Sequence, residues 1–357
     1  MIDILKKQRM MVACLIMLVC TVLLLSACGT TADTPVKENE VAVTDTTTTN
    51  AADTENQEGD TSDQNETTKR YTDYMNRESE IPANPQRVAA VAGAGTVIDL
   101  LELGFEPVGY PYRYLDNSTI LSSVHERLKV TAQDLGMPTN MEALLENNPD
   151  LIVFGYETQE REYEMLEKIA PVAAFNEDLS YAERLKVIGE IVGKQEQAEQ
   201  LLNDLDQQIE AMWTNLREQG DIQEGETAAV VVYYWNKKMF LMKNFSLFDV
   251  INHPSGMPMS PEVAALLPKG SSPYIEITEE AMPSSLIADH LFMLYANNEE
   301  AVSGFEQLKN NGVYKSLPPV KNGKVHYIPL EYNNSDLITV RKLIEDFPAL
   351  LRGEVTN

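Results

Sequence analysis

The sequence predicts an α/β protein with two lobes, each built on a central, mostly parallel sheet and joined by one long α-helix. Short apolar runs alternate with helical patterns in residues 81–171, which is the rhythm of a parallel sheet. The same rhythm starts again after residue 220. Between the two series, residues 182–219 carry a helical pattern that only Gly189 and Gly193 interrupt. These three observations define the expected fold class.

Residues 1–27 have the features of a secretory signal peptide. Basic residues precede a run, 10–25, that is apolar apart from Thr21. This run is shorter than the roughly 20 residues that a membrane-spanning helix needs. It ends in the sequence LSAC, which is similar to a bacterial lipobox, whose cysteine receives a diacylglycerol before the signal is removed. We therefore expect Cys28 to be lipidated; the alternative is an uncleaved membrane anchor.

Residues 28–78 are expected to form a disordered, acidic, Thr-rich linker after the lipidated cysteine. Residues 29–68 contain ten acidic side chains, one lysine and no aromatic residue, so they cannot bury enough surface to fold. The formal charge of the chain is −27, and loss of the signal peptide moves it to −29. Such a charge argues against binding to nucleic acid and against electrostatic binding to anionic lipids. Because Cys14 and Cys20 leave with the signal, no disulfide or thiolate metal site is expected.

The first lobe is predicted to span residues 79–180. Its strands are short apolar runs that end at a glycine or a tyrosine, and its helices have helical spacing with Gly104, Asn140 or Pro171 at an end. In order, the predicted elements are a strand at 87–92, a helix at 97–103, a strand at 107–110, a helix at 140–146, a strand at 149–155 and a helix at 161–169.

Residues 181–220 are predicted to form the helix that links the lobes. From Ala198 to Leu216, apolar side chains recur at steps of three and four residues, which is the pattern of an amphipathic helix of roughly 20 residues. A helix of about 30 Å is long for a crossover within a small sheet. It is therefore expected to connect two lobes.

The second lobe is predicted to span residues 221–357. Apolar runs again give the strands, and the turn Asn322-Gly323 precedes the last of them. In order, the predicted elements are a strand at 227–234, a hairpin partner at 238–242, a helix at 245–251, a strand at 288–295, a short helix from 305, a strand at 325–328 and a closing helix at 337–351.

Motifs of enzymes are absent from the sequence. It contains no G-x-S-x-G, Walker loop or H-E-x-x-H, and Gly93-Ala94-Gly95 lacks the third glycine of a dinucleotide fingerprint. The four histidines do not cluster, and His290 and His326 lie in strand patterns that suggest core or rim positions. We expect no catalytic residues, no cofactor and no metal site, although a lipid-anchored α/β enzyme with an unrecognised site stays open.

Aromatic and a few basic residues follow the strands of both predicted lobes. Because open α/β sheets bind ligands beyond the carboxyl ends of their strands, these residues predict a cleft for a bulky organic ligand. The alternative is that tyrosines merely cap strands. The candidate ligand-binding residues are Tyr110, Tyr112, Arg113, Tyr156, Tyr234, Trp235, Lys237, Tyr295 and Tyr332.

Several stretches, taken in their order and spacing, resemble a known family. They are 85–91, 100–109, 140–144, 148–153, 168–172, 277–280, 288–292 and 320–325, and the similarity extends from about residue 81 to the end. On these stretches the chain is similar to the helical-backbone (class III) substrate-binding proteins of ABC transporters, which carry ferric siderophores, heme or cobalamin.

The resemblance implies a monomeric receptor, lipid-anchored on the outer face of the membrane of a Gram-positive type of cell. It would capture a ferric siderophore between its lobes and deliver it to an ABC permease with a cytoplasmic ATPase. In the family, one acidic residue on each lobe docks on the permease; Glu142 fits the first position and Glu280 the second, with Glu279 as a competitor. A surface adhesion or sensor module without transport remains an alternative.

The chemical class of the ligand is expected to be a ferric hydroxamate. Aromatic walls with only Arg113 and Lys237 as obvious cations suit a neutral or mildly charged chelate better than anionic catecholates or citrates. The siderophore holds its own iron, so the protein needs no metal ligands. Heme and cobalamin remain open, since tyrosine or histidine can ligate heme iron.

Overall fold

The computed structural model describes residues 67–116, 118–155, 160–234, 238–243, 245–267, 274–296 and 299–354. Contacts divide the chain into two units, Met1–Thr61 and Ser62–Asn357, and all described residues belong to the second. The predicted signal peptide, Cys28 and most of the linker lie outside the described residues. Among the helices that are described, none is both long and apolar enough to cross a membrane.

The first sheet is parallel throughout and confirms the predicted first α/β series. Its strand order is β5-β4-β3-β6-β7, and β3 and β6 lie at its centre as fully buried apolar strands. Such strands read as continuous apolar runs because both faces of the sheet are covered. Their bounds are β3 Val88–Val91, β4 Gly109–Tyr110, β5 Gln133–Asp134, β6 Leu151–Phe154 and β7 Val172–Ala174.

Helices of this lobe begin where the sequence offers caps or tight turns. The side chain of Asn140 accepts hydrogen bonds from the amides of Glu142 and Ala143 and so caps α4, as the sequence predicts. Gly93 is the N-cap of α2, which makes the Gly93-Ala94-Gly95 segment a strand-to-helix turn. The helices are α2 Ala94–Glu102, η1 Tyr112–Tyr114, α3 Ser122–Leu128, α4 Met141–Glu146 and α5 Glu160–Leu166.

A two-stranded hairpin precedes the first predicted strand and corrects the expected end of the linker at residue 78. Strands β1 (Thr68–Thr72) and β2 (Glu78–Pro82) pair in antiparallel register. Each strand buries only one side chain, Tyr71 or Ile81. Since most of the strand residues are polar and only two are buried, the hairpin has no apolar run by which the sequence could reveal it.

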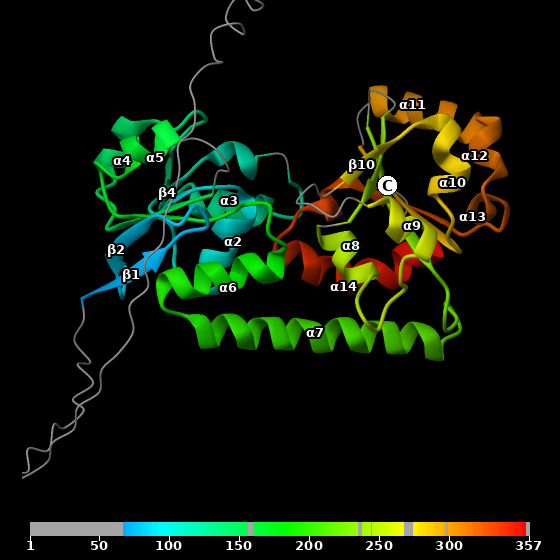
Figure 1. The fold of residues 1–357 in the computed structure, drawn as a ribbon, viewed down its shortest axis with the longest axis horizontal. Helices are drawn as coiled ribbons and strands as arrows, with labels where there is room; N and C mark the ends of the chain where they lie inside the picture. Colours follow the sequence, from blue (N-terminus) through cyan, green and yellow to red (C-terminus); the bar gives the residue numbers. More distant parts are fainter. Residues whose placement is uncertain are drawn as a thin grey trace, which may run out of the picture. The chain divides into compact units, whose positions relative to one another are not determined.

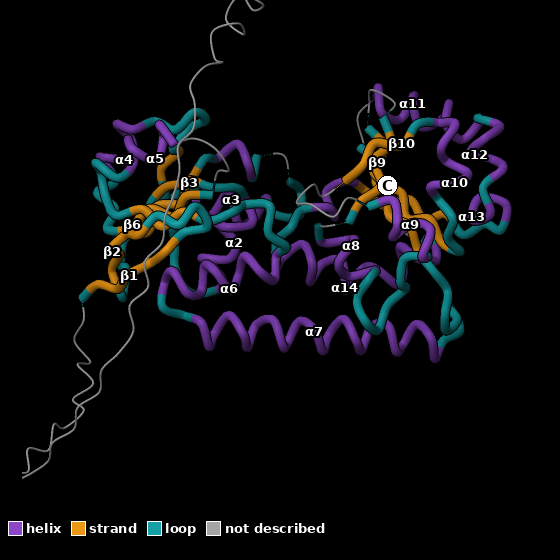
Figure 2. Tube along the Cα trace, viewed as in Figure 1, coloured by secondary structure: helices purple, strands orange, loops and turns teal. Residues whose placement is uncertain are grey.

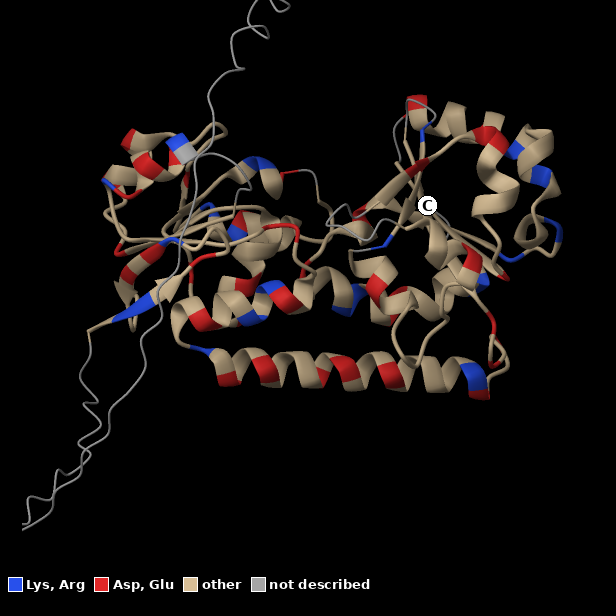
Figure 3. Cartoon of the chain, in the orientation of Figure 1, with Lys and Arg blue, Asp and Glu red and all other residues tan. Residues whose placement is uncertain are grey.

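The predicted linking segment contains two helices rather than one. Helix α6 (Tyr181–Val192) ends at Gly193, whose φ of +72° is left-handed and suits glycine, and α7 (Gln195–Glu218) follows. The two helices lie side by side (Figure 1), and a Cβ on Gly189 would stand 2.8 Å from the Cβ of Ala198. With 24 residues, α7 is about 36 Å long and packs on both α6 and α14. Exposed acidic residues recur along its outer face (Figure 3).

The second sheet is mixed and confirms the second α/β series. Its order is β10-β9-β8-β11-β12. Strand β11 pairs in parallel with β8 and β12, and β9 pairs antiparallel with both β8 and β10. The pairing of β8 with β9 is the hairpin that the sequence predicts. The strands are β8 Ala228–Tyr233, β9 Met239–Met242, β10 Tyr274–Ile277, β11 His290–Tyr295 and β12 Val325–Pro329.

Helices lie on both faces of this sheet, as Figure 2 shows with helices in purple around the orange strands. The closing helix α14 confirms the helix predicted at 337–351; the side chain of Asp336 caps it at the start and Gly353 ends it. The bounds are α8 Ser246–Ile251, α9 Pro261–Leu266, η2 Glu279–Ala281, α10 Met282–Ser285, α11 Glu299–Asn310, α12 Gly312–Ser316, α13 Pro318–Lys321, η3 Leu330–Asn333 and α14 Leu337–Arg352.

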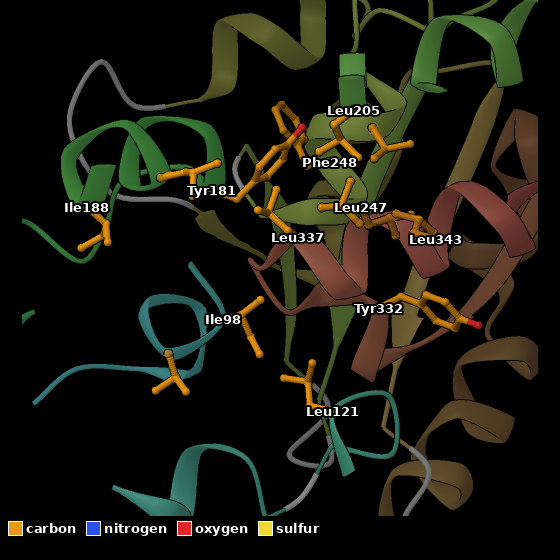
Figure 4. Close-up of a cluster of buried hydrophobic side chains, with 14 of the residues drawn as sticks. Ile98, Leu121, Tyr181, Ile188, Leu205, Leu247, Phe248, Tyr332, Leu337 and Leu343 are labelled. Carbon is orange, nitrogen blue, oxygen red and sulfur yellow. The ribbon is translucent and has the colours of Figure 1, made fainter. Parts of the chain in front are cut away.

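One hydrophobic core continues from the first lobe into the second. Figure 4 shows part of it, where side chains of α2, α6 and α7 gather with those of α8 and α14. Ile98, Leu247, Leu337 and Leu343 are all fully buried in this cluster. Because protein interiors are closely packed, such a shared core resists large rearrangement of one lobe against the other.

A buried ion pair lies where the two lobes meet beside this core. Arg184 of α6 donates through Nε to Asp99 Oδ2 of α2 at 2.6 Å and through Nη2 to the carbonyl of Ser335 at 2.5 Å. Asp99 and Arg184 are 0% and 3% exposed. Burial raises the pKa of Asp99 to about 6 although Arg184 opposes the shift. Gly95 leaves the space for this contact, since a Cβ added at this position would stand 2.5 Å from Arg184 Cζ.

Candidate functional site

The carboxyl ends of the parallel strands carry the candidate ligand-binding residues. In the first lobe, Tyr110 ends β4, and Tyr112 and Arg113 lie in the following η1. In the second lobe, Tyr234 follows β8 and Tyr295 ends β11. Tyr332 lies in η3, which follows β12. Tyr156, Trp235 and Lys237 lie outside the described residues.

Tyr110 is fully buried, and its hydroxyl is occupied within the protein. The hydroxyl lies 2.9 Å from His125 Nδ1, and His125 Nε2 lies 2.8 Å from Asp116 Oδ1. Burial raises the pKa of Tyr110. This chain of polar contacts fixes the segment after β4 and leaves the ring of Tyr110 with no exposed surface.

Tyr112 and Arg113 are more accessible. The ring of Tyr112 is half-buried against Tyr110, with centroids 4.9 Å apart, and its hydroxyl donates to the carbonyl of Ala132. The Arg113 side chain is exposed. After β4, the first lobe therefore presents the ring of Tyr112 and the positive charge of Arg113.

The tyrosines of the second lobe also differ in exposure. Tyr234 is half-buried and packs edge-on against Phe240 with centroids 5.7 Å apart. Tyr295 stacks on Phe305 at 5.4 Å and is partly exposed. Tyr332 is only 7% exposed and donates to Asp346 Oδ2 of α14 at 2.5 Å. Tyr234 and Tyr295 can thus present ring surface to a ligand, whereas Tyr332 packs onto α14.

Sequence reasoning missed Glu177, which follows β7. Its carboxylate accepts a hydrogen bond from the backbone amide of Gly93, at the end of β3, and it is partly exposed. Burial raises the pKa of Glu177 to about 7. Glu177 stands in a polar loop, Asn176-Glu177-Asp178, with no motif around it, and only folding brings it to Gly93.

Glu142 and Glu280 are both exposed, on different lobes. Glu142 lies in the first turn of α4, where a negative charge interacts favourably with the helix dipole. Glu280 lies in η2, and none of the described residues forms a hydrogen bond or ion pair with its carboxylate. By contrast, Glu279 accepts a hydrogen bond from the side-chain amide of Asn311. Of the two candidates for the second docking position, Glu279 is therefore held by a side-chain hydrogen bond, whereas Glu280 has none among the described residues.

His290 and His326 lie near the amino ends of β11 and β12, at the other end of these strands from Tyr295 and Tyr332. Their rings stack at 5.3 Å, and His290 Nδ1 lies 3.0 Å from His326 Nε2. Burial lowers the pKa of His326 to about 4. These are the core and rim positions that the sequence indicates. Within the described ranges, no three His, Cys, Asp or Glu side chains gather in a way that could hold a metal ion.

Comparison with known proteins gives one family match and several relatives. A family model described as periplasmic binding protein matches residues 100–332. The probable siderophore-binding lipoprotein YfiY of Bacillus subtilis is 26% identical over 261 residues, covering 71% of this chain and 78% of the relative. The iron(3+)-hydroxamate-binding protein YxeB of the same organism is 25% identical over 254 residues, covering 69% and 73%.

Solved structures share the fold. The structure of Staphylococcus aureus SirA complexed with staphyloferrin B superimposes with a TM-score of 0.67 and 22% identity, over 80% of this chain and 99% of the other. At this identity the likeness concerns the fold: two α/β lobes with the linking helices described above.

Proposed function

The chain belongs to the periplasmic binding protein family, and from this premise we propose that it captures a ferric siderophore of the hydroxamate type for an ABC importer. The family is one of binding proteins and not of enzymes. The observation that carries the proposal is that two curated relatives, each covering about 70% of the chain, are named for binding a siderophore or iron(3+)-hydroxamate.

The arrangement of the strand ends supports the same proposal. Tyr112, Tyr234 and Tyr295 offer ring faces from both lobes, and Arg113 adds an exposed positive charge after β4 of the first sheet. Aromatic faces with few charges suit a bulky, weakly charged chelate. The chelate brings its own iron, so binding depends on shape and on ligand polarity.

The receptor is proposed to work at the outer face of the membrane as a monomer. Cys28 would carry the lipid, as the name of the lipoprotein relative supports, and the acidic linker would give the folded part its reach. Glu142 and Glu280 would dock on the permease, one from each lobe. Of the two acidic residues at the second position, Glu280 is favoured because Asn311 already engages Glu279.

Titration of tryptophan fluorescence tests the binding of a ferric chelate. The chain has two tryptophans; Trp213 is fully buried and donates to the carbonyl of Val250, whereas Trp235 follows a strand at the proposed site. We expect a ferric trihydroxamate to quench emission with saturation at one equivalent. Trp235→Phe should remove most of the quenching, and Trp213→Phe should retain it. Quenching by heme or cobalamin but not by any hydroxamate would assign the receptor to another ligand class.

A further inference from the structure

The carboxylate of Glu177 lies at the ends of three strands of the first sheet. Glu177 follows β7 by three residues, and its Oε1 accepts the hydrogen bond from the amide of Gly93, just beyond β3. Gly155, directly after β6, is equally close: a Cβ on Gly155 would stand 3.2 Å from Glu177 Cδ. A Cβ on Gly93 would also meet the carboxylate. Two glycines thus leave room for one acidic group where ligands bind in open α/β sheets.

Among the described residues, no lysine or arginine forms an ion pair with the carboxylate of Glu177. Arg184 of α6 is the nearby positive charge, but its guanidinium is bound to Asp99 and to the carbonyl of Ser335. Asp178, next in the loop and exposed, adds a second negative charge. Glu177 itself is partly exposed, so solvent reaches its side chain at the strand ends.

Resting on the proposed function, we propose that Glu177 sets the charge preference of the ligand site. Its carboxylate favours a ferric chelate that presents an ammonium or other hydrogen-bond donor, and it disfavours one that presents a free carboxylate. A unit charge several ångströms away, at the dielectric of a partly exposed site, changes affinity by about threefold to tenfold in each direction. Arg113 lies at the end of the adjacent β4, so the two charges also orient a chelate that carries groups of both signs.

Three linear ferric trihydroxamates that differ only at one end test this role. The end is a primary ammonium in the first, a neutral acetamide in the second and a succinyl carboxylate in the third. For the mature protein at pH 8, calorimetry should give affinities that fall in this order, with steps of about threefold to tenfold. Glu177→Gln, which keeps an acceptor for the Gly93 amide, should reduce both steps to less than about twofold. The matched control Asp178→Asn removes the same charge one residue away and should retain the order.

A pH series on the wild-type protein provides a second readout that needs no variant. The groups that act on Glu177 are the Gly93 amide at the start of α2, Arg184 from α6 and Asp178 in its own loop, while Gly155 from β6 brings no charge. Since burial raises the pKa of Glu177 to about 7, its carboxyl group is largely protonated at pH 5.5. The preference for the ammonium chelate should therefore shrink between pH 8 and pH 5.5.

The failure of this role and the failure of the proposed function give different results. Equal affinities of the wild-type protein for all three chelates, or an unchanged order in Glu177→Gln, would overturn the role of Glu177 and leave hydroxamate capture intact. Binding of none of the three would overturn the capture of hydroxamates and the role of Glu177 together.

Discussion

Replacing Glu142 and Glu280 together with alanine is expected to abolish uptake of the ferric chelate and to leave its affinity for the protein unchanged. Both side chains are exposed and lie on different lobes, so neither contributes to the core. Loss of Glu142 removes a favourable helix-dipole interaction of at most about 1 kcal/mol. Charged residues at an interface govern association and register, so loss of both anchors should prevent delivery to the permease.

The measurement is uptake of radioactive iron by cells that carry only the variant receptor, alongside calorimetry on the purified protein. The matched control is Glu142→Ala with Glu279→Ala, which also removes one acidic residue from each lobe. Because Glu279 is engaged by Asn311, this pair should retain more transport than the first. Normal uptake by Glu142→Ala with Glu280→Ala would eliminate the proposed docking residues.

Replacing Arg184 with methionine is expected to destabilise the protein by about 3–5 kcal/mol at pH 8, because it leaves the Asp99 carboxylate buried without its partner. Asp336, whose pKa burial also raises, lies close enough to add repulsion. The double replacement Asp99→Leu with Arg184→Met should recover most of this loss, since an apolar pair in place of a buried ion pair is often neutral.

The loss should depend on pH in a defined direction. Asp99 already has a folded-state pKa of about 6, above its ordinary value of 3.8, so its protonation favours the folded state and stability falls as pH rises through this range. Without Arg184, this pKa rises further. Unfolding by denaturant should therefore show a larger deficit for Arg184→Met at pH 8 than at pH 5. A deficit under about 1 kcal/mol at both pH values would contradict the role of this pair between the lobes.

The sequence predicts the α/β lobes well because their strands are buried on both faces. Runs such as 88–91 and 151–154 leave no polar position, which is typical of strands at the centre of a parallel sheet. The hairpin of β1 and β2 escapes prediction because its strands bury only Tyr71 and Ile81 and contain no apolar run. The division of the linking segment depends on the left-handed conformation of Gly193, while Gly189, the other glycine, continues the helix.

The candidate site is predicted only in part, for a geometric reason. Sequence places tyrosines at strand ends but cannot tell which way each ring turns. Tyr110 and Tyr332 are buried with their hydroxyls engaged, whereas Tyr234 and Tyr295 keep exposed surface. Glu177 meets Gly93 across 84 residues of sequence, and that contact exists only in the folded sheet.

Native mass spectrometry of the mature protein with a mixture of a ferric trihydroxamate, heme and cobalamin tests the capture of a ferric hydroxamate most directly. The predicted result is one intact ferric trihydroxamate bound per protein chain, with the complex retained when all three ligands are present in equal amounts. A one-to-one complex with heme or cobalamin in place of the hydroxamate, or no complex with any of the three, would contradict it.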